Sequence, residues 1–231
     1  MNKIAKVIAL DGPSGSGKST IAKELAKKLN VVYIDTGAMF RAIGLTAHGL
    51  GISFHEGPEF QQFLSTLILE YGVSSSVLIK ANGSDLTSAI REHHVSELAS
   101  QVSKIPSVRT FLLNFQRQLA SSRTCVMEGR DIGTVVFPNA FCKVFMTASN
   151  DVRAKRRLDQ LRQQGDHSIT LDQILQDMII RDERDASRDV APLKQAADAF
   201  LLDTSALTFD QVLNSLVKMA SERAQELGLS L

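Results

Sequence analysis

Nine consecutive residues near the start of the chain match the phosphate-binding pattern GxxxxGK[ST]. They are Gly12, Pro13, Ser14, Gly15, Ser16, Gly17, Lys18, Ser19 and Thr20. Glycines in such a loop let the backbone turn several N–H groups toward a polyphosphate, and the helix that follows adds a partial positive charge. We expect Lys18 to reach the outer phosphates of ATP and the Ser19 hydroxyl to bind Mg²⁺. The alternative is a glycine-rich turn that holds no ligand.

Two further polar clusters directly follow apolar runs. In the first, Asp35 ends the run, Thr36 is expected to cap the next helix, and Arg41 lies one turn into it. In the second, Glu128 is expected to hold Mg²⁺ through a water molecule, and Arg130 to pair with a phosphate. The alternatives are a capped helix with a solvated arginine and a solvated charged loop.

Two more groups are ambiguous by themselves. Arg181, Asp185 and Arg188 have spacings of four and three, which place them on one helical face. Their alternative role is a pair of surface salt bridges. The basic segment 153–157 begins a predicted helix, where positive charge opposes the helix dipole. This segment either covers an anion such as ATP or forms a solvated basic face.

Short apolar runs that alternate with amphipathic helical patterns predict the elements that position these groups. The predicted strands are 6–10, 31–34, 124–128, 142–147 and 199–203. The predicted helices are 18–29, 38–48, 108–120, 151–163, 171–186 and 209–226. This order predicts an α/β fold with a doubly wound, parallel five-stranded sheet. The carboxyl ends of its strands would gather the polar clusters at one edge.

One stretch interrupts this alternation. Apolar runs at 67–71 and 77–80 are followed by Asn82 and Gly83, a pair typical of a tight hairpin turn. A small inserted unit of antiparallel strands is therefore expected. We predict a core of residues 1–53 and 106–231 and an inserted unit at 54–105.

The composition excludes several classes of protein. The net charge of the 231 residues is +1, which argues against a dedicated nucleic-acid surface. Both cysteines, Cys125 and Cys142, fall in strand-like runs, as expected of buried thiols in a reducing compartment. The longest apolar runs are far shorter than the roughly 18 residues of a membrane span. The N-terminus lacks a signal-peptide pattern, so we expect a cytoplasmic protein without membrane contact.

Taken together, these segments resemble the bacterial cytidylate kinases, or CMP kinases, of the P-loop nucleoside monophosphate kinase family. The resemblance rests on DGPSGSGKST at 11–20, DTGAMFRA at 35–42, ASQVSKIPSVR at 99–109, EGRDIGTVVFPNA at 128–140 and RDERDASRDVAPL at 181–193. The phosphate loop is shared by very many proteins, whereas the last two blocks are much more specific. The resemblance spans nearly the whole chain. It implies a P-loop NTPase-type core, an NMP-binding insertion and a lid at about 151–168.

The resemblance also implies roles for single residues. Arg41, Arg130 and Arg188 would grip the CMP phosphate, and Lys18, Arg130 and Arg188 would be catalytic. Ser100, Arg109 and Asp131 would read the cytosine, with Asp131 accepting from the exocyclic amine and Arg109 donating to the ring acceptors. Arg181 and Asp185 would contact the ribose, and Thr36 would also lie at the nucleotide. The lid arginines would be Arg153, Arg156 and Arg157, over ATP.

Two positions depart from the family pattern. Glu128 stands where many members have aspartate, which lengthens its reach to Mg²⁺ by one methylene group. Phe40 stands where tyrosine is common, so a hydroxyl is missing near the monophosphate site. Neither departure changes the expected reaction type.

The expected activity is transfer of the γ-phosphate of ATP to CMP or dCMP, with Mg²⁺, by a monomeric enzyme and without a covalent intermediate. One alternative is a P-loop kinase for another small acceptor, such as another nucleotide or shikimate. The other alternative is an ATP-binding switch without transfer activity. The arginines at 41, 130 and 188 favour a kinase, because a switch does not need a second phosphate clamp.

Overall fold

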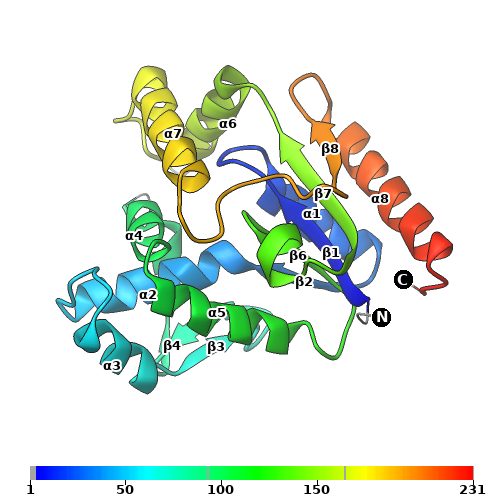
Figure 1. The fold of residues 1–231 in the computed structure, drawn as a ribbon. Helices are drawn as coiled ribbons and strands as arrows, with labels where there is room; N and C mark the ends of the chain where they lie inside the picture. Colours follow the sequence, from blue (N-terminus) through cyan, green and yellow to red (C-terminus); the bar gives the residue numbers. More distant parts are fainter. Residues whose placement is uncertain (1–3, 93, 164, 231) are drawn as a thin grey trace. The chain divides into compact units, whose positions relative to one another are not determined.

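The computed structural model describes residues 4–92, 94–163 and 165–230 (Figure 1). The chain divides into two compact units. The first combines the residues up to Ile34 with those from Ala120 onward, and the second is Asp35–Leu119. Among the described residues, no helix has the length and apolar character that crossing a lipid bilayer would require.

A five-stranded parallel sheet forms the centre of the first unit, as the sequence predicts. Its order is β2-β6-β1-β7-β8. The strands are β1 (Ala5–Asp11), β2 (Val32–Asp35), β6 (Cys125–Gly129), β7 (Ala140–Thr147) and β8 (Phe200–Asp203). Because β1 lies between β6 and β7, the loop after β1 is flanked by the loops that follow both neighbours.

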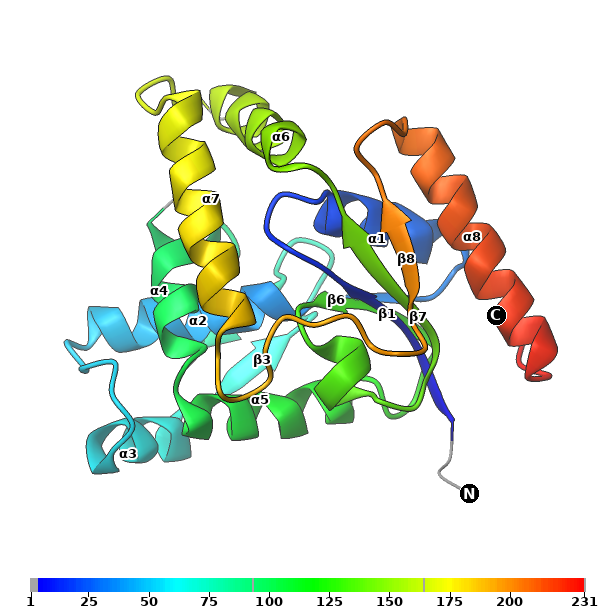
Figure 2. The ribbon, with the colours of Figure 1, turned by 45° about the horizontal axis from the view of Figure 1, so that its top comes forward.

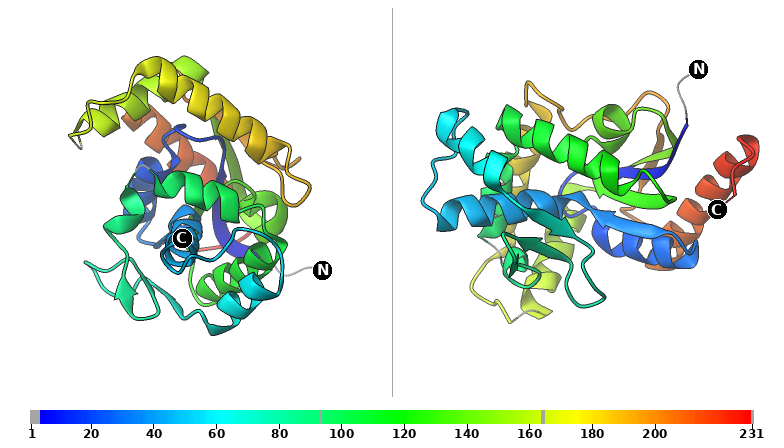
Figure 3. Two further views of the ribbon diagram at one scale, coloured as in Figure 1. Left: turned by 90° about the vertical axis from the view of Figure 1, so that its left-hand side faces the viewer. Right: turned by 90° about the horizontal axis from the view of Figure 1, so that it is seen from below.

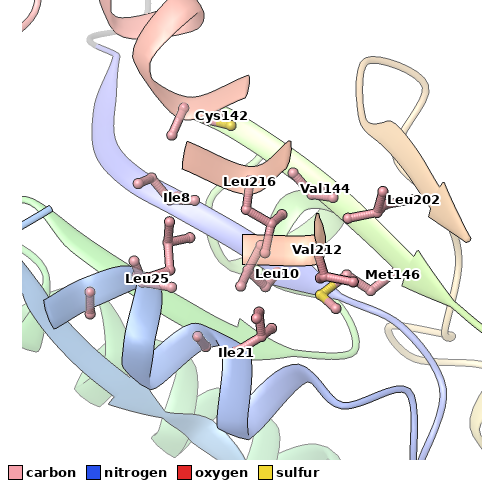
Figure 4. Packing of buried hydrophobic residues seen from close by; sticks show 14 of the residues in the cluster. Ile8, Leu10, Ile21, Leu25, Cys142, Val144, Met146, Leu202, Val212 and Leu216 are labelled. Atoms are coloured by element: carbon pink, nitrogen blue, oxygen red, sulfur yellow. The ribbon is translucent and has the colours of Figure 1, made fainter. Parts of the chain in front are cut away.

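Two helices cover one face of this sheet and bury the main hydrophobic core. They are α1 (Lys18–Lys28) and α8 (Phe209–Glu226). Figure 4 shows Ile21 and Leu25 of α1 and Leu216 of α8 gathered over β1 and β7. Cys142 lies in this core, and both cysteines are buried free thiols whose pKa burial raises to about 12.

A second pair of helices forms an arm with a small core of its own. In Figure 2, α6 (Asn150–Gln163) and α7 (Leu171–Ala186) lie side by side. Their shared cluster consists of Ala154, Leu158, Leu161, Ile174 and Met178. The first unit also contains η2 (Ile132–Val136), a short π-helix that the sequence pattern did not predict.

The second unit is mainly helical, with one small antiparallel sheet (Figure 3). Its helices are α2 (Thr36–Gly49), α3 (Pro58–Thr66), η1 (Ala89–Arg91), α4 (Val95–Val102) and α5 (Pro106–Leu119). Its strands are β3 (Leu69–Tyr71), β4 (Ile79–Ala81) and β5 (Ser84–Asp85). The predicted hairpin turn is confirmed, because Asn82 and Gly83 join β4 to β5 with φ values of 50° and 79°. The segment predicted as an insertion, 54–105, lies between α2 and α5 in this unit.

Candidate active site

The loop between β1 and α1 has a backbone that only glycine permits at its first position. Gly12 has a φ of 148°, and a Cβ atom there would lie 2.0 Å from the carbonyl oxygen of Met146. Gly15 and Gly17 have φ values of 73° and 85°. Gly17 caps α1 without a side-chain hydrogen bond, so no side chain competes for the first N–H groups of this helix. The predicted strand, loop and helix are therefore present in the order that phosphate binding requires.

Lys18 is buried and lies over its own loop. Its Nζ donates to the carbonyl oxygen of Pro13 at 2.7 Å and to the Ser16 hydroxyl at 3.1 Å. Burial, and then the positive charge of Arg130, hold the pKa of Lys18 well below its usual value, while Glu128 acts in the opposite direction. The positive charges of Lys18 and Arg130 thus repel one another, and an anion bound near both would reduce this repulsion.

Ser19 and Glu128 are brought together as the sequence suggests. The Ser19 hydroxyl donates to Glu128 Oε2 at 2.9 Å, and the Tyr33 hydroxyl donates to Oε1 of the same carboxylate at 2.5 Å. Hydroxyl and carboxylate oxygens are the ligands that Mg²⁺ prefers, and Mg²⁺ is usually held by one or two protein groups together with substrate phosphates. These residues fit a nucleotide-bound Mg²⁺ ion. Tyr33 has no counterpart among the predicted site residues.

Asp11 links the end of β1 to η2. Its two carboxylate oxygens accept hydrogen bonds from Ile132 N at 2.8 Å and Gly133 N at 2.7 Å. Burial raises the pKa of Asp11 to about 6, although both hydrogen bonds act to lower it. Asp131, immediately before η2, is also buried.

Arg130 and Arg188 form an ionic cluster around the buried carboxylate of Asp185. Arg130 Nε donates to Asp185 Oδ2 at 3.0 Å, and Arg188 Nη1 lies 3.9 Å from Asp185 Oδ1. Burial favours the neutral acid, but Arg130, Arg181 and Arg188 outweigh it and hold the pKa of Asp185 below its usual value. The prediction of one helical face is wrong for Arg188, because α7 ends at Ala186 and Ser187 caps it. The surface salt-bridge alternative also fails, since Asp185 is only 4% exposed.

Asp182 connects α7 to the phosphate loop. One of its oxygens accepts from Ser14 N at 3.1 Å, and the other pairs with Arg153. Arg153 also donates to the carbonyl oxygen of Ser14 at 2.8 Å. Of the other predicted lid arginines, Arg156 bonds to Thr204, and Arg157 bonds to Gln160 on the helix surface. In this structure Arg153 and Arg156 therefore form hydrogen bonds with other residues of the first unit.

In the second unit, Asp35 and not Thr36 caps α2. The Asp35 carboxylate accepts from Ala38 N at 2.9 Å and from Arg91 at 3.2 Å, and its backbone N–H donates to the Tyr71 hydroxyl at 2.7 Å. Thr36 is the first helical residue and is buried. The expected cap at Thr36 is thus corrected by one position, because the extended backbone of Asp35 suits the cap.

The predicted cytosine readers of the second unit lie on α4 and α5. Ser100 is buried on α4, and Arg109 on α5 donates to the carbonyl oxygen of Ser103 at 3.2 Å. The Arg109 guanidinium also lies 5.7 Å from the centre of the Phe40 ring. Phe40 therefore supplies a cation–π contact at the position where a tyrosine hydroxyl is missing. Arg41 lies beside it on α2.

The chain is similar along most of its length to proteins of one known family. A family model described as cytidylate kinase matches residues 8–222. A cytidylate kinase of Exiguobacterium sp. is 45% identical over 93% of this chain and 96% of its own length. One from Thermotoga maritima is 41% identical over 94% of this chain and 97% of its own length.

Solved structures with low sequence identity show the fold alone. A gluconokinase from Sinorhizobium meliloti 1021 matches 98% of both chains with a TM-score of 0.50 and 16% identity. The match to the family model, in contrast, runs from β1 into α8 and includes the residues of the phosphate loop and of the arginine cluster. The chain belongs to the cytidylate kinase family.

Proposed function

We propose that this protein transfers the γ-phosphate of ATP to CMP or dCMP, giving ADP and CDP or dCDP. The observation that carries the proposal is the phosphate loop together with the arginine cluster: Ser19 of the loop donates to Glu128 at the end of β6, and Arg130, two residues further on, pairs with Asp185. Lys18 belongs to a loop suited to a nucleoside triphosphate, and Arg130 belongs to a separate arginine cluster. When no ligand is bound, these two cations repel one another. An anion that contacts both, such as a phosphoryl group during its transfer, stabilises them.

On the donor side, we assign the ATP phosphates to the loop from Gly12 to Thr20 and to Lys18. Mg²⁺, when bound, would neutralise charge on the phosphates, and Ser19 and Glu128 are the residues that would hold it, Glu128 through water. Lys18 would leave the Pro13 carbonyl oxygen and turn to the phosphates. Arg153, Arg156 and Arg157, in the lid at about 151–168, would exchange part of their present contacts for ATP.

On the acceptor side, we assign the CMP phosphate to Arg41, Arg130 and Arg188. Ser100, Arg109 and Asp131 would recognise cytosine, because a carboxylate accepts from its exocyclic amine and a guanidinium donates to its ring acceptors. Uracil carries a carbonyl in place of that amine and would face Asp131 with a second acceptor. The remaining residues assigned to the acceptor are Thr36, Arg181 and Asp185.

Catalysis in this proposal comes from position and charge. The arginines and Lys18 would stabilise the charge on the transferring group, and exclusion of water would strengthen these interactions. The acceptor is already an anionic phosphate, so the reaction does not require a side chain that removes a proton before attack.

The deciding experiment is a coupled assay of ADP formation with CMP, dCMP, UMP and AMP as acceptors. We expect fast turnover with CMP and dCMP and much slower turnover with UMP and AMP. ADP release that depends on none of the acceptors would contradict the kinase proposal and favour an ATP-binding switch. Preference for AMP or UMP would retain the kinase but contradict the assigned acceptor.

The role of the inserted unit, the cellular location and the oligomeric state of the enzyme also belong to the proposal. We assign residues 54–105 to an NMP-binding unit, and we expect hydrogen exchange in this segment to slow with CMP more than with ATP alone. Unchanged exchange would contradict the assignment. We further propose a cytoplasmic monomer, and sedimentation of the purified protein tests its oligomeric state.

A further inference from the structure

Arg91 of η1 pairs with a buried carboxylate at the start of α2. Its Nη1 donates to Asp35 Oδ2 at 3.2 Å, while Asp35 Oδ1 accepts from the backbone N–H of Ala38. The Asp35 side chain is only 3% exposed, whereas that of Arg91 is 46% exposed. A buried carboxylate without a cation is strongly unfavourable, so Asp35 depends on a positively charged partner.

A second arginine lies close to the same carboxylate. A Cβ atom on Gly37 would lie 3.2 Å from Asp35 Oδ1 and 3.2 Å from Arg41 Nη1, so both groups approach one point beside the first turn of α2. Among the described residues, neither a hydrogen bond nor an ion pair joins Arg41 to Asp35. The carboxylate is therefore paired with the arginine of η1 and not with the arginine of its own helix.

We attribute this pairing to charge and not to a lack of hydrogen-bonding capacity. Each carboxylate oxygen has two lone pairs, so Asp35 Oδ1 can accept a second hydrogen bond besides that of Ala38. Arg91, however, neutralises Asp35 and repels another guanidinium group, and the positive N-terminus of α2 adds to the repulsion. The charge of Arg91 thus lowers the attraction between Asp35 and Arg41.

We propose that Arg91 is a positioning residue for the acceptor phosphate, because its pairing with Asp35 leaves the Arg41 guanidinium for CMP. The inference deepens the proposed function and rests on the assignment of Arg41 to the CMP phosphate made there. Without Arg91, the Arg41 guanidinium can turn to the buried carboxylate of Asp35, and this movement would withdraw it from the phosphate.

The inserted segment holds the start of α2 at two points. Arg91 follows Ile90, a fully buried residue of η1, and bonds to the Asp35 carboxylate. Tyr71 of β3 accepts from the backbone N–H of Asp35 at 2.7 Å. The insertion thus fixes both the backbone and the charge of Asp35, which gives this segment a part in binding the acceptor phosphate.

The test separates the charge of Arg91 from its hydrogen bond. Arg91→Gln keeps a donor but removes the charge, and we expect KM for CMP to rise about tenfold, because a hydrogen bond from Arg41 to the charged phosphate is lost. KM for ATP should stay within about twofold of the wild-type value. Arg91→Lys is the matched control, since an ammonium group can replace the single hydrogen bond to Asp35 and keeps the charge. Its KM for CMP should also stay within about twofold.

Removal of the Asp35 charge should abolish the effect of Arg91→Gln. In Asp35→Asn the side-chain oxygen can still accept from Ala38 N, but no carboxylate remains to attract Arg41. The double variant Asp35→Asn/Arg91→Gln should therefore have the same KM for CMP as Asp35→Asn. A tenfold rise in both backgrounds would show a purely structural role and overturn the inference, as would a normal KM for CMP in Arg91→Gln. If Arg91→Gln does not fold, the comparison of the two variants that contain Asp35→Asn decides by itself.

Arg41→Ala distinguishes failure of the inference from failure of the proposed function. An unchanged KM for CMP in this variant would contradict both the assignment of Arg41 to the phosphate and the inference. A raised KM in Arg41→Ala, together with no effect of Arg91→Gln, would contradict only the inference. In a protein that already carries Arg41→Ala, we expect Arg91→Gln to leave KM for CMP within about twofold. A further tenfold rise there would show that Arg91 acts independently of Arg41 and would overturn the inference.

Discussion

The hydroxyl of Ser19 donates to Glu128 Oε2 across 2.9 Å, which joins the end of the phosphate loop to the end of β6. The other oxygen of the same carboxylate accepts from Tyr33. Both oxygens of Glu128 are thus oriented by hydroxyl groups before any ligand binds. Such preorganisation compensates for the extra methylene group that glutamate has relative to aspartate, because a longer side chain has more rotamers to lose.

Tyr33→Phe should therefore weaken the response to Mg²⁺. Loss of a residue that orients a metal-linked carboxylate commonly costs at least about tenfold in metal affinity, and we expect the Mg²⁺ concentration for half-maximal rate to rise by roughly that factor. Tyr71→Phe removes the other tyrosine hydroxyl of the chain and serves as the control. Equal Mg²⁺ titrations for wild type and Tyr33→Phe would show that this hydroxyl has no part in metal binding.

Lys18→Ala tests the phosphate loop. The expected loss in kcat is on the order of a thousandfold, because charge that develops in the transition state loses its partner. The circular dichroism spectrum should not change, because the hydrogen bonds described for the Lys18 side chain go to Pro13 and Ser16 of its own loop. Nearly normal turnover would rule out the P-loop kinase mechanism.

Asp131→Asn tests base recognition. The amide can donate to the O4 atom of uracil, and it places a donor against the amine of cytosine. One unmatched buried polar group costs ~1–3 kcal/mol, so kcat/KM for CMP should fall by roughly 5- to 150-fold and the gap to UMP should narrow. If Asp131 only maintains the loop, kcat/KM falls by the same factor for CMP and UMP, and the ratio of the two values stays constant.

Asp185→Ala should destabilise the fold as well as reduce activity. The substitution leaves Arg130 and Arg188 near each other without the buried carboxylate, a change that costs about 3 kcal/mol of unfolding free energy. Urea denaturation at pH 7 measures the difference. Asp172→Ala, in the first turn of the same helix and exposed, is the control and should remain close to wild type.

The pH dependence of this difference has a defined sign. The pKa of Asp185 is lower in the folded state, so its stabilising effect is complete above the usual carboxyl value of 3.8 and is lost as the pH falls below it. The gap in stability between wild type and Asp185→Ala should therefore shrink only in strong acid. A gap that already shrinks between pH 7 and pH 5 would contradict the ionic explanation.

Local patterns predicted most of the fold. Leu171–Ala186 and Phe209–Glu226 have the predicted boundaries because each directly follows a threonine that forms a capping box with a glutamine three residues later. Helix α3 was missed although Pro58 at its start and Phe60, Phe63 and Leu64 at helical spacing were visible signals. The π-helix η2 has no such pattern, because its first N–H groups donate to Asp11, over 100 residues away along the chain.

The difference between local sequence patterns and contacts between distant segments also explains which residues of the candidate site were predictable. The phosphate loop is a contiguous motif, so its residues are recognisable from sequence. Tyr33 and Asp182 act on Glu128 and Ser14 from distant segments, and only the folded chain brings these partners together. The sequence did contain a partial signal for Asp11, which directly precedes the glycine loop as a charged residue at the end of an apolar strand. A buried charge at such a place requires partners.

The two tyrosine side chains are intrinsic fluorophores of the protein. The chain has no tryptophan and only two tyrosines, so its intrinsic fluorescence arises from Tyr33 and Tyr71. Tyr33 donates to a carboxylate in the first unit, and Tyr71 accepts from a backbone amide in the second. A phenol bound to a carboxylate emits weakly, so any change in the hydrogen bond between Tyr33 and Glu128 when an ion binds should change the emission of Tyr33. Emission from a Tyr71→Phe protein would then follow events at the phosphate loop without an added dye.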